Sequence, residues 1–293
     1  MTRAIVACMH AYTPFGQEFY KPILGSFIKQ LEKYQEEWDK LYIIVDNNWD
    51  IEIKGIDKIE TIKVDSNLRY YDAYKEALPQ IKEDLVLFMD NDMVVYKKGN
   101  IAKTFFSLES TIFSDGRGPS DVVSIIDQIG EYQTSQLKNG NKFCPYWFAA
   151  KKELLMGYRD IDWGSNMPHS ETLGKLTEAM LSDGVKAYEQ PEDKSGIMFD
   201  GTEQYPEQHT TGGRGYYHVR AGSSTAYLLA TKKYGNKQTY DDYIKSQPHM
   251  EILRQASWYK YMGGDPTEVV FDVIGNTMEF EDYYQKFLEY HGL

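Results

Sequence analysis

Short apolar runs alternate with amphipathic segments along the first third of the chain. Strands are expected at the apolar runs Arg3–Met9, Leu41–Val45, Ile59–Val64 and Leu85–Met89. Between them, apolar residues recur at helical spacing over Glu18–Trp38 and Leu68–Ile81. Buried strands that alternate with amphipathic helices predict an α/β fold: an open, mostly parallel, Rossmann-like sheet with right-handed crossovers and helices on both faces.

The polar residues after Leu85–Met89 carry the first candidate chemistry. A run of apolar residues without a break suits a strand that is buried on both faces. Asp90, Asn91 and Asp92 follow it directly, at the end where open α/β sheets bind ligands. Neighbouring carboxylates repel unless a cation neutralises them, and their hard oxygen atoms suit Mg²⁺ or Mn²⁺. The same composition is common in turns, so an ordinary polar turn is the alternative.

Polar loops also follow the first two strands. His10–Thr13 comes after the first strand and Asp46–Asn48 after the second. Because the carboxyl ends of parallel strands meet at one edge of a sheet, these loops and Asp90–Asp92 are expected to converge on a nucleotide-type site. Neither a Gly-x-Gly-x-x-Gly nor a Walker Gly-Lys-Ser/Thr motif follows the first strand, which makes dinucleotide dehydrogenases and P-loop enzymes poor fits.

The second half of the chain continues the alternation and ends in helices. Further elements are expected as a helix over 101–113, a strand over 121–126, an apolar aromatic segment over 142–150, a helix from Ser170–Thr172 to Asp183–Gly184, and a strand over 185–188. Gln190–Gly215 is long and patternless, which is typical of a binding loop or lid. From Ala226 the chain is mostly helical. The expected organisation is one sheet domain over 1–225 and a helical C-terminal extension over 226–293.

Composition and charge narrow the classes of partner. The chain has 293 residues and a net charge of −12, which argues against a nucleic-acid backbone or an anionic membrane as a main partner. A nucleotide ligand stays possible, because a bound divalent cation supplies positive charge locally. Two cysteines, Cys8 and Cys144, form no disulfide framework or zinc cluster. Without a leader or an apolar run of about 18 residues, the protein is expected to be soluble and cytoplasmic, with no transmembrane segment.

Taken together, several stretches resemble the GT-A-fold glycosyltransferases, most closely the family-two type. They are Arg3–Met9 with its polar exit, Leu41–Asp46, Asn67–Leu78, Asp84–Val95, Tyr146–Gly157, Glu171–Leu176 and Tyr216–Ser223. The Asp90-Asn91-Asp92 segment matches the Asp-x-Asp motif of that family. Arg69 and Asp72 depart from it, since the family often has Gly or Asn there. The resemblance covers roughly residues 3–225 and leaves out the helical tail.

The resemblance implies a donor site for a nucleoside-diphosphate sugar of the UDP or GDP type. It assigns the metal, Mn²⁺ or Mg²⁺, to Asp90, Asp92 and His218, and the imidazole mildly favours manganese. It assigns the nucleotide to His10, Ala11, Tyr12, Asp46, Asn67, Arg69, Asp90 and Asn91. Each of these residues has an ordinary structural alternative, such as a core histidine for His218, a turn aspartate for Asp46 or a solvated helix arginine for Arg69.

An inverting transfer requires a carboxylate that deprotonates the acceptor hydroxyl. Glu171, at a predicted helix start, is the first candidate base by resemblance, and Asp162 is the second. The helix dipole would keep Glu171 ionised there, and the same position also fits a capping residue. The expected activity is therefore hexosyl transfer to a carbohydrate or other hydroxyl acceptor. Two other classes stay open: a sugar-nucleotide nucleotidyltransferase and a non-catalytic carbohydrate-binding protein of the same fold.

Overall fold

The computed structural model shows an α/β chain that forms two compact units. It describes residues 1–9, 14–51, 53, 57–65, 68–95, 98–109, 120–128, 141–164, 173–190, 197–199, 202–204, 210–211, 216–218, 227–232, 237–247, 249–291 and 293. Unit 1 comprises Met1–Tyr12, Tyr34–Asp90 and Gly99–Glu192, and unit 2 comprises Thr13–Lys33, Asn91–Lys98 and Asp193–Leu293. The predicted boundary at residue 225 stays a prediction, because residues 219–226 lie outside the described residues.

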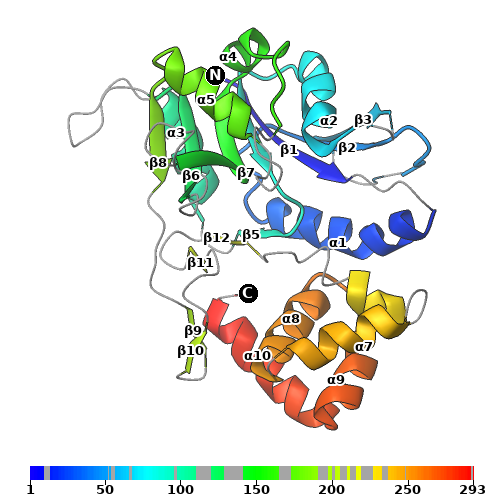
Figure 1. The fold of residues 1–293 in the computed structure, drawn as a ribbon. Helices are drawn as coiled ribbons and strands as arrows, with labels where there is room; N and C mark the ends of the chain where they lie inside the picture. Colours follow the sequence, from blue (N-terminus) through cyan, green and yellow to red (C-terminus); the bar gives the residue numbers. More distant parts are fainter. Residues whose placement is uncertain are drawn as a thin grey trace. The chain divides into compact units, whose positions relative to one another are not determined.

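Unit 1 is built on a seven-stranded sheet of order β3-β2-β1-β4-β7-β6-β8 (Figure 1). Its strands are β1 Arg3–Met9, β2 Lys40–Asp46, β3 Ile59–Val64, β4 Leu85–Met89, β6 Val122–Gln128, β7 Asn141–Lys151 and β8 Ala187–Gln190. The neighbours from β3 to β4 are parallel, as are β6 and β8, whereas β7 is antiparallel to both β4 and β6. The prediction of an open, mostly parallel sheet is confirmed.

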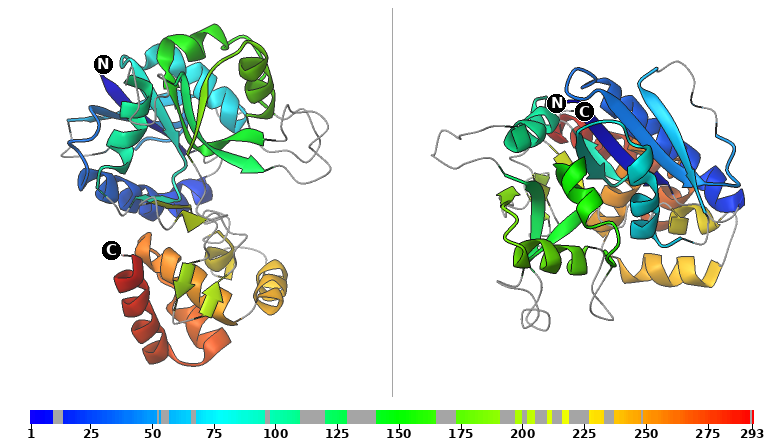
Figure 2. Two further views of the ribbon diagram at one scale, coloured as in Figure 1. Left: turned by 90° about the vertical axis from the view of Figure 1, so that its left-hand side faces the viewer. Right: turned by 90° about the horizontal axis from the view of Figure 1, so that it is seen from above.

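Helices cover both faces of this sheet (Figure 2). On one face, α2 Tyr70–Ala77, α4 Lys152–Gly157 and α5 Gly174–Ser182 pack against every second strand residue. The core on that face includes Val6, Cys8, Tyr42, Ile44, Tyr74, Phe88, Phe148, Leu155, Trp163 and Leu176. On the other face, α3 Asn100–Glu109 contacts β4, β6 and β7, and Trp147 donates a hydrogen bond to Thr104.

Several predicted helix ends were wrong. The helix expected over 18–38 is α1 Pro14–Glu32. Tyr34 and Trp38 are buried, but they lie in the segment between α1 and the second strand rather than on a helix face. The helix expected over 68–81 is α2, continued by the 3₁₀ turn η1 Leu78–Gln80, because Pro79 cannot donate an α-helical hydrogen bond.

Two helix starts also differ from the expected ones. Helix α2 begins at Tyr70 rather than Leu68, with Arg69 as its N-cap and without a side-chain capping bond. Helix α5 begins at Gly174 with Leu173 as its N-cap in the left-handed region, φ 72°. Glu171 therefore precedes the cap, and it lies outside the described residues. The predicted end at Asp183–Gly184 is confirmed, with Gly184 at φ +79°.

Unit 2 contains α1, three short strand ladders and the C-terminal helices. Strand β5 Met93–Val95 pairs with β12 Tyr216–His218, which pairs with β11 Thr210–Thr211. Strands β9 Ile197–Phe199 and β10 Thr202–Gln204 form a hairpin. The helices are α7 Lys237–Ser246, α8 His249–Tyr261, α9 Thr267–Ile274 and α10 Thr277–His291. Val94 of β5 belongs to the same apolar cluster as Trp258 and Phe287, which ties the strand to this helical core.

Candidate nucleotide and metal site

The ends of three neighbouring strands define the candidate site in unit 1. Strand β1 lies between β2 and β4 and is parallel to both, so their carboxyl ends share one edge of the sheet. Asp46 is the last residue of β2 and is fully buried, and Asp90 follows β4. His10, Ala11 and Tyr12 follow β1 but lie outside the described residues, as does Asn67. The predicted convergence of β1, β2 and β4 is confirmed at the level of the strands.

Asp90 is contacted by a tyrosine that sequence reasoning missed. The Tyr70 hydroxyl donates a very short hydrogen bond to Asp90 Oδ1, and its oxygen lies 2.7 Å from the Tyr74 hydroxyl. The two rings meet edge to face with centroids 5.0 Å apart. Burial, and then the nearby Asp90 charge, raise the pKa of Tyr70 well above its usual range, so the phenol is neutral. The spacing of Tyr70 and Tyr74 on one helix face was the available signal.

In unit 2, strand pairing brings His218 next to Asp92. Asp92 is buried, with 6% of its surface exposed, and it directly precedes β5. The register of the β12–β5 ladder sets His218 opposite Met93 and Tyr217 opposite Val94. The backbone of His218 therefore lies across the ladder from the residue after Asp92, although the two are far apart in sequence.

A buried glutamine fixes the other edge of β5. Gln30 of α1 is 4% exposed. Its Nε2 donates to the Met93 carbonyl at 2.5 Å, and its Oε1 accepts from the Val95 amide at 2.8 Å. The carboxamide thus bonds the two groups that a neighbouring strand would bond. Sequence reasoning did not assign Gln30 a role, because its place on α1 gives no signal of a contact with β5.

The donor set fits a divalent cation by its chemistry. Carboxylates with one imidazole suit Mn²⁺ in particular, and the ladder sets the backbone of His218 beside that of the residue after Asp92. Among the side chains that the structure describes, no group of three His, Cys, Asp or Glu residues is arranged to hold a metal. The ligand assignment of Asp90, Asp92 and His218 therefore stays a prediction that the strand register favours.

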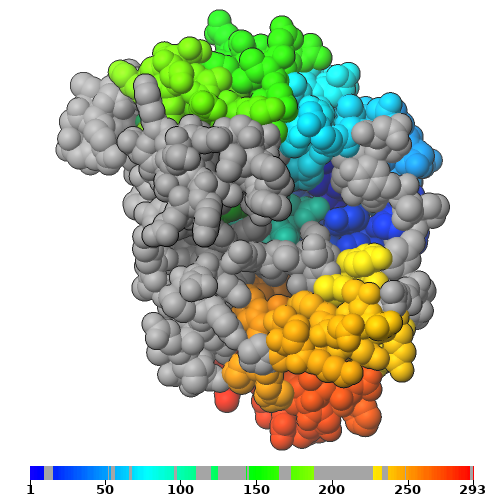
Figure 3. Space-filling model, in the orientation of Figure 1, coloured from blue at the N-terminus to red at the C-terminus, as the bar shows by residue number. Residues whose placement is uncertain are grey.

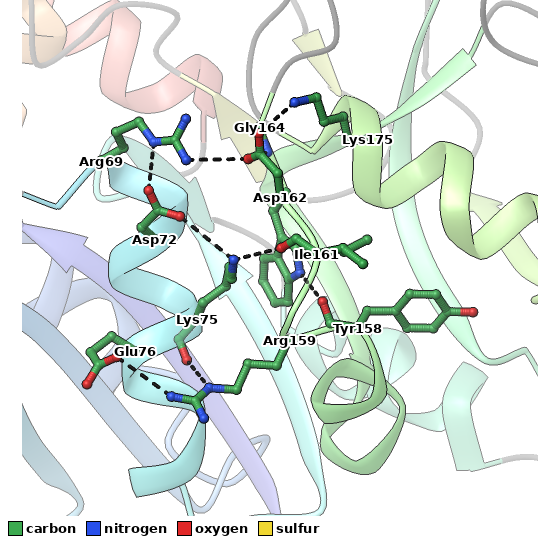
Figure 4. A network of polar contacts seen from close by, with 11 residues as sticks. Arg69, Asp72, Lys75, Glu76, Tyr158, Arg159, Ile161, Asp162, Gly164 and Lys175 are labelled. Carbon is green, nitrogen blue, oxygen red and sulfur yellow. Dashed lines mark hydrogen bonds and ion pairs between the residues drawn. The ribbon is translucent and has the colours of Figure 1, made fainter.

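Asp162, the second candidate base, lies in a network of ion pairs on unit 1 (Figure 4). Its Oδ2 accepts from Lys175 Nζ at 2.6 Å, and its Oδ1 accepts from the Gly164 amide at 2.8 Å and from Arg69 at 3.4 Å. The Lys175 bond first, and the Gly164 amide next, lower the pKa of the Asp162 carboxyl. The carboxylate is ionised, as a base must be, but its low pKa weakens it as a proton acceptor.

Arg69 takes part in the same network. Its Nε donates to Asp72 at 2.6 Å, and its guanidinium lies 4.4 Å from the centre of the Tyr71 ring. The side chain is 58% exposed, so its predicted contact with a diphosphate stays a prediction. In the space-filling view, the surface of α2 (cyan) adjoins that of α4 and α5 (green), as these contacts require (Figure 3).

The loop over residues 158–164 is bonded to α2 at further points. Lys75 Nζ donates to the Ile161 carbonyl at 2.7 Å, and Arg159 Nε donates to the Lys75 carbonyl at 3.3 Å. Trp163 Nε1 donates to the Tyr158 carbonyl at 2.8 Å. These bonds hold the loop that carries Asp162 against α2.

Comparisons with known proteins give loose structural likenesses. Neither a family model nor a curated protein matches the chain. The bifunctional IspDF from Campylobacter jejuni is 13% identical, with a TM-score of 0.44 over 90% of this chain and 80% of its own. The mannosyltransferase PcManGT from Pyrobaculum calidifontis, solved with GDP-Man and Mn²⁺, is 12% identical, with a TM-score of 0.41 over 99% and 84%. The inositol-1-phosphate CTP transferase from T. maritima is 12% identical, with a TM-score of 0.39 over 64% and 85%.

Sequence identities and TM-scores this low do not indicate which reaction this chain catalyses. A CTP transferase and a mannosyltransferase stand together among them, so they do not separate nucleotidyl transfer from glycosyl transfer. The assignment of function therefore depends on the residues of the site. No helix in the described part of the chain combines the length and the apolar character that crossing a bilayer requires.

Proposed function

We propose that this protein is a metal-dependent glycosyltransferase that moves a sugar from a nucleoside-diphosphate sugar, of the UDP or GDP type, to an acceptor hydroxyl. The observation that carries the proposal is the ladder that sets His218 opposite Met93, beside Asp92. An Asp-x-Asp segment after a buried strand is a common turn composition by itself. A histidine brought from a distant part of the chain to the end of that segment is not explained by a turn.

The named residues would divide the work as follows. A bound Mn²⁺ or Mg²⁺ would supply positive charge that stabilises the departing nucleoside diphosphate. Asp90, Asp92 and His218 would hold it. Asp46 would accept a hydrogen bond from the base or ribose, with His10, Ala11, Tyr12, Asn67 and Asn91 lining the nucleotide and Arg69 near the diphosphate. Glu171 would deprotonate the acceptor hydroxyl in an inverting transfer, and Asp162 is the second candidate for that step.

A sugar-nucleotide nucleotidyltransferase is the second candidate, because it shares the use of carboxylates and metal. That class typically has a basic, glycine-rich loop after the first strand. Tyr12–Gly16 contains neither Arg nor Lys, which favours glycosyl transfer. A non-catalytic carbohydrate-binding protein is the third candidate, and it predicts no metal-dependent nucleotide binding.

Thermal unfolding with a panel of nucleoside diphosphates and triphosphates, each with and without Mn²⁺, tests the proposal. A ligand at 100 times its dissociation constant stabilises the native state by about 2.7 kcal/mol, which raises the Tm measurably. We expect one diphosphate to stabilise the chain only with Mn²⁺. Asp92→Ala and His218→Ala should abolish that shift. Asp50→Ala, at a fully exposed aspartate, should leave it unchanged.

Product analysis separates the candidate activities. A glycosyltransferase releases a nucleoside diphosphate from a nucleotide sugar when an acceptor is added. A nucleotidyltransferase releases pyrophosphate from a nucleoside triphosphate and a sugar phosphate. If no nucleotide shifts the Tm of the native chain with metal, the proposal is wrong and the binding-protein candidate is favoured.

A further inference from the structure

A line of hydrogen bonds, partly buried at Tyr70, runs toward Asp90 from two elements of unit 1, β1 and α2. Tyr74 bonds the backbone of Cys8 in β1, its hydroxyl lies 2.7 Å from that of Tyr70, and Tyr70 donates to Asp90 Oδ1. We call Cys8, Tyr74 and Tyr70 the tyrosine relay. Cys8 and Tyr74 are 1% and 2% exposed, and the Tyr74 ring packs on Phe88 of β4 with centroids 4.5 Å apart. The relay joins β1, α2 and the end of β4.

The direction of the bonds in the relay follows from the number of protons available. The Tyr70 hydroxyl has a single proton, which it donates to Asp90 Oδ1. Tyr70 then has no proton left for Tyr74, and Tyr74 must donate to the Tyr70 oxygen. Tyr74 in turn accepts from Cys8, whose backbone offers an amide proton. Each donor in the relay therefore points toward Asp90, an arrangement in which successive hydrogen bonds polarise one another.

A tyrosine donor orients a carboxylate without neutralising it. One bond to Oδ1 restrains rotation of the Asp90 carboxyl group about its Cβ–Cγ bond. A lysine or arginine in the same place would add a positive charge and compete with a cationic ligand. A phenol adds none. The packing of Tyr74 against Phe88 holds the relay against β4, the strand that directly precedes Asp90.

We propose that Tyr70 is a positioning residue for Asp90, and that the tyrosine relay sets the orientation in which Asp90 meets the metal-bound nucleotide. This inference rests on the proposed function. It concerns residues outside the predicted ligand set, none of which would touch the metal or the nucleotide itself. Groups of this kind, one bond removed from a metal ligand, typically change metal affinity 10- to 100-fold when they are removed.

A double-mutant cycle on the full chain tests the inference. The measurement is the dissociation constant of the stabilising nucleoside diphosphate with Mn²⁺, together with the dissociation constant of Mn²⁺ alone by electron paramagnetic resonance. Tyr70→Phe keeps the ring and removes the donor, so we expect both constants to rise by about tenfold. Tyr74→Phe leaves the Tyr70–Asp90 bond in place, so we expect a rise of about two- to threefold. Tyr71→Phe, at the neighbouring residue outside the relay, should change neither constant.

The Asp90→Asn background decides how Tyr70 acts. If Tyr70 works through Asp90, Tyr70→Phe has no further effect on either constant when Asp90→Asn is already present. An unchanged affinity in Tyr70→Phe, or an equal loss in both backgrounds, overturns the inference. If the native chain binds no nucleotide with metal, both the proposed function and this inference are wrong. If the native chain binds and Tyr70→Phe binds equally well, only this inference is wrong, and the proposed function stands.

Discussion

Adjacent residues at the start of α2 contact two different carboxylates in two different ways. Tyr70 donates to Asp90 from a partly buried position, through a neutral phenol. Arg69 contacts Asp162 at the surface, where Lys175 adds a second positive charge. Asp90 is thereby oriented without a cation from the relay, whereas two cations balance the charge of Asp162. The same helix start can prepare one carboxylate to meet a cationic ligand and use another to fasten a loop.

This difference bears on which carboxylate takes part in chemistry. Asp162 accepts three hydrogen bonds, two of them from cations, and bonds of this number and type are typical of a structural carboxylate. Its place as the second candidate base stays a prediction, but the lowered pKa of its carboxyl favours Glu171 for that step. Glu171 lies outside the described residues, so its own environment does not enter this comparison.

The largest expected effect separates the two carboxylates directly. Asp90→Asn removes a predicted metal ligand, so the affinity for nucleotide with Mn²⁺ should fall by at least about tenfold. Asp162→Asn should leave that affinity within about twofold of native, because its partners are Lys175 of α5, the Gly164 backbone amide and Arg69, none of which is a predicted metal ligand. Isothermal titration with the stabilising nucleotide measures both. A loss as large in Asp162→Asn as in Asp90→Asn would remove the distinction.

A substitution at Gly164 should disrupt the contacts around Asp162. A Cβ on Gly164 would lie 2.5 Å from the Tyr71 hydroxyl oxygen and 2.9 Å from Asp162 Oδ1. Gly164→Ala should therefore displace both side chains and lower the free energy of unfolding by about 1–3 kcal/mol. Gly157→Ala is the matched control, since nothing lies within 4 Å of its Cβ position. Urea unfolding measures both, and equal stabilities of the two variants would contradict the packing described.

The smallest effect is a dependence of stability on pH. The folded pKa of Asp162 is lowered, so its contribution is present above the unfolded pKa of about 3.9 and is lost as the pH falls through the folded value. The native chain should exceed Asp162→Asn in stability by less than about 1 kcal/mol at pH 7, because the ion pairs are partly exposed. That difference should shrink below about pH 4 in urea titrations. A difference that grows toward low pH would contradict the assigned sign.

Much of the fold could be predicted because apolar runs report directly on buried strands. The strands Arg3–Met9 and Ile59–Val64 end where their patterns predict. The antiparallel direction of β7 left no such signal, since a strand buried on both faces has the same pattern in either direction. Helix ends failed where a local pattern competed with packing, as at Leu173, whose left-handed conformation begins α5.

The site was predictable only in its polar strand ends. Asp46 and Asp90 could be singled out as candidates from the sequence, because each is an acidic residue that directly follows an unbroken apolar run. Tyr70 and Gln30 do not, because a tyrosine or glutamine on an amphipathic helix has many ordinary uses. Their roles depend on contacts with segments far away in the sequence, which no local pattern contains.

The bond between Gln30 and β5 has a consequence for how copies of the chain behave in concentrated solution. A strand at the edge of a sheet offers unpaired amide and carbonyl groups, which an extended segment of another molecule can bond. Strand β5 pairs with β12 on one side, and on the other the Gln30 carboxamide occupies the Met93 carbonyl and the Val95 amide. An incoming strand would first have to displace this buried side chain. Gln30 thus protects β5 from pairing with a strand of another molecule, and so from aggregation by that route.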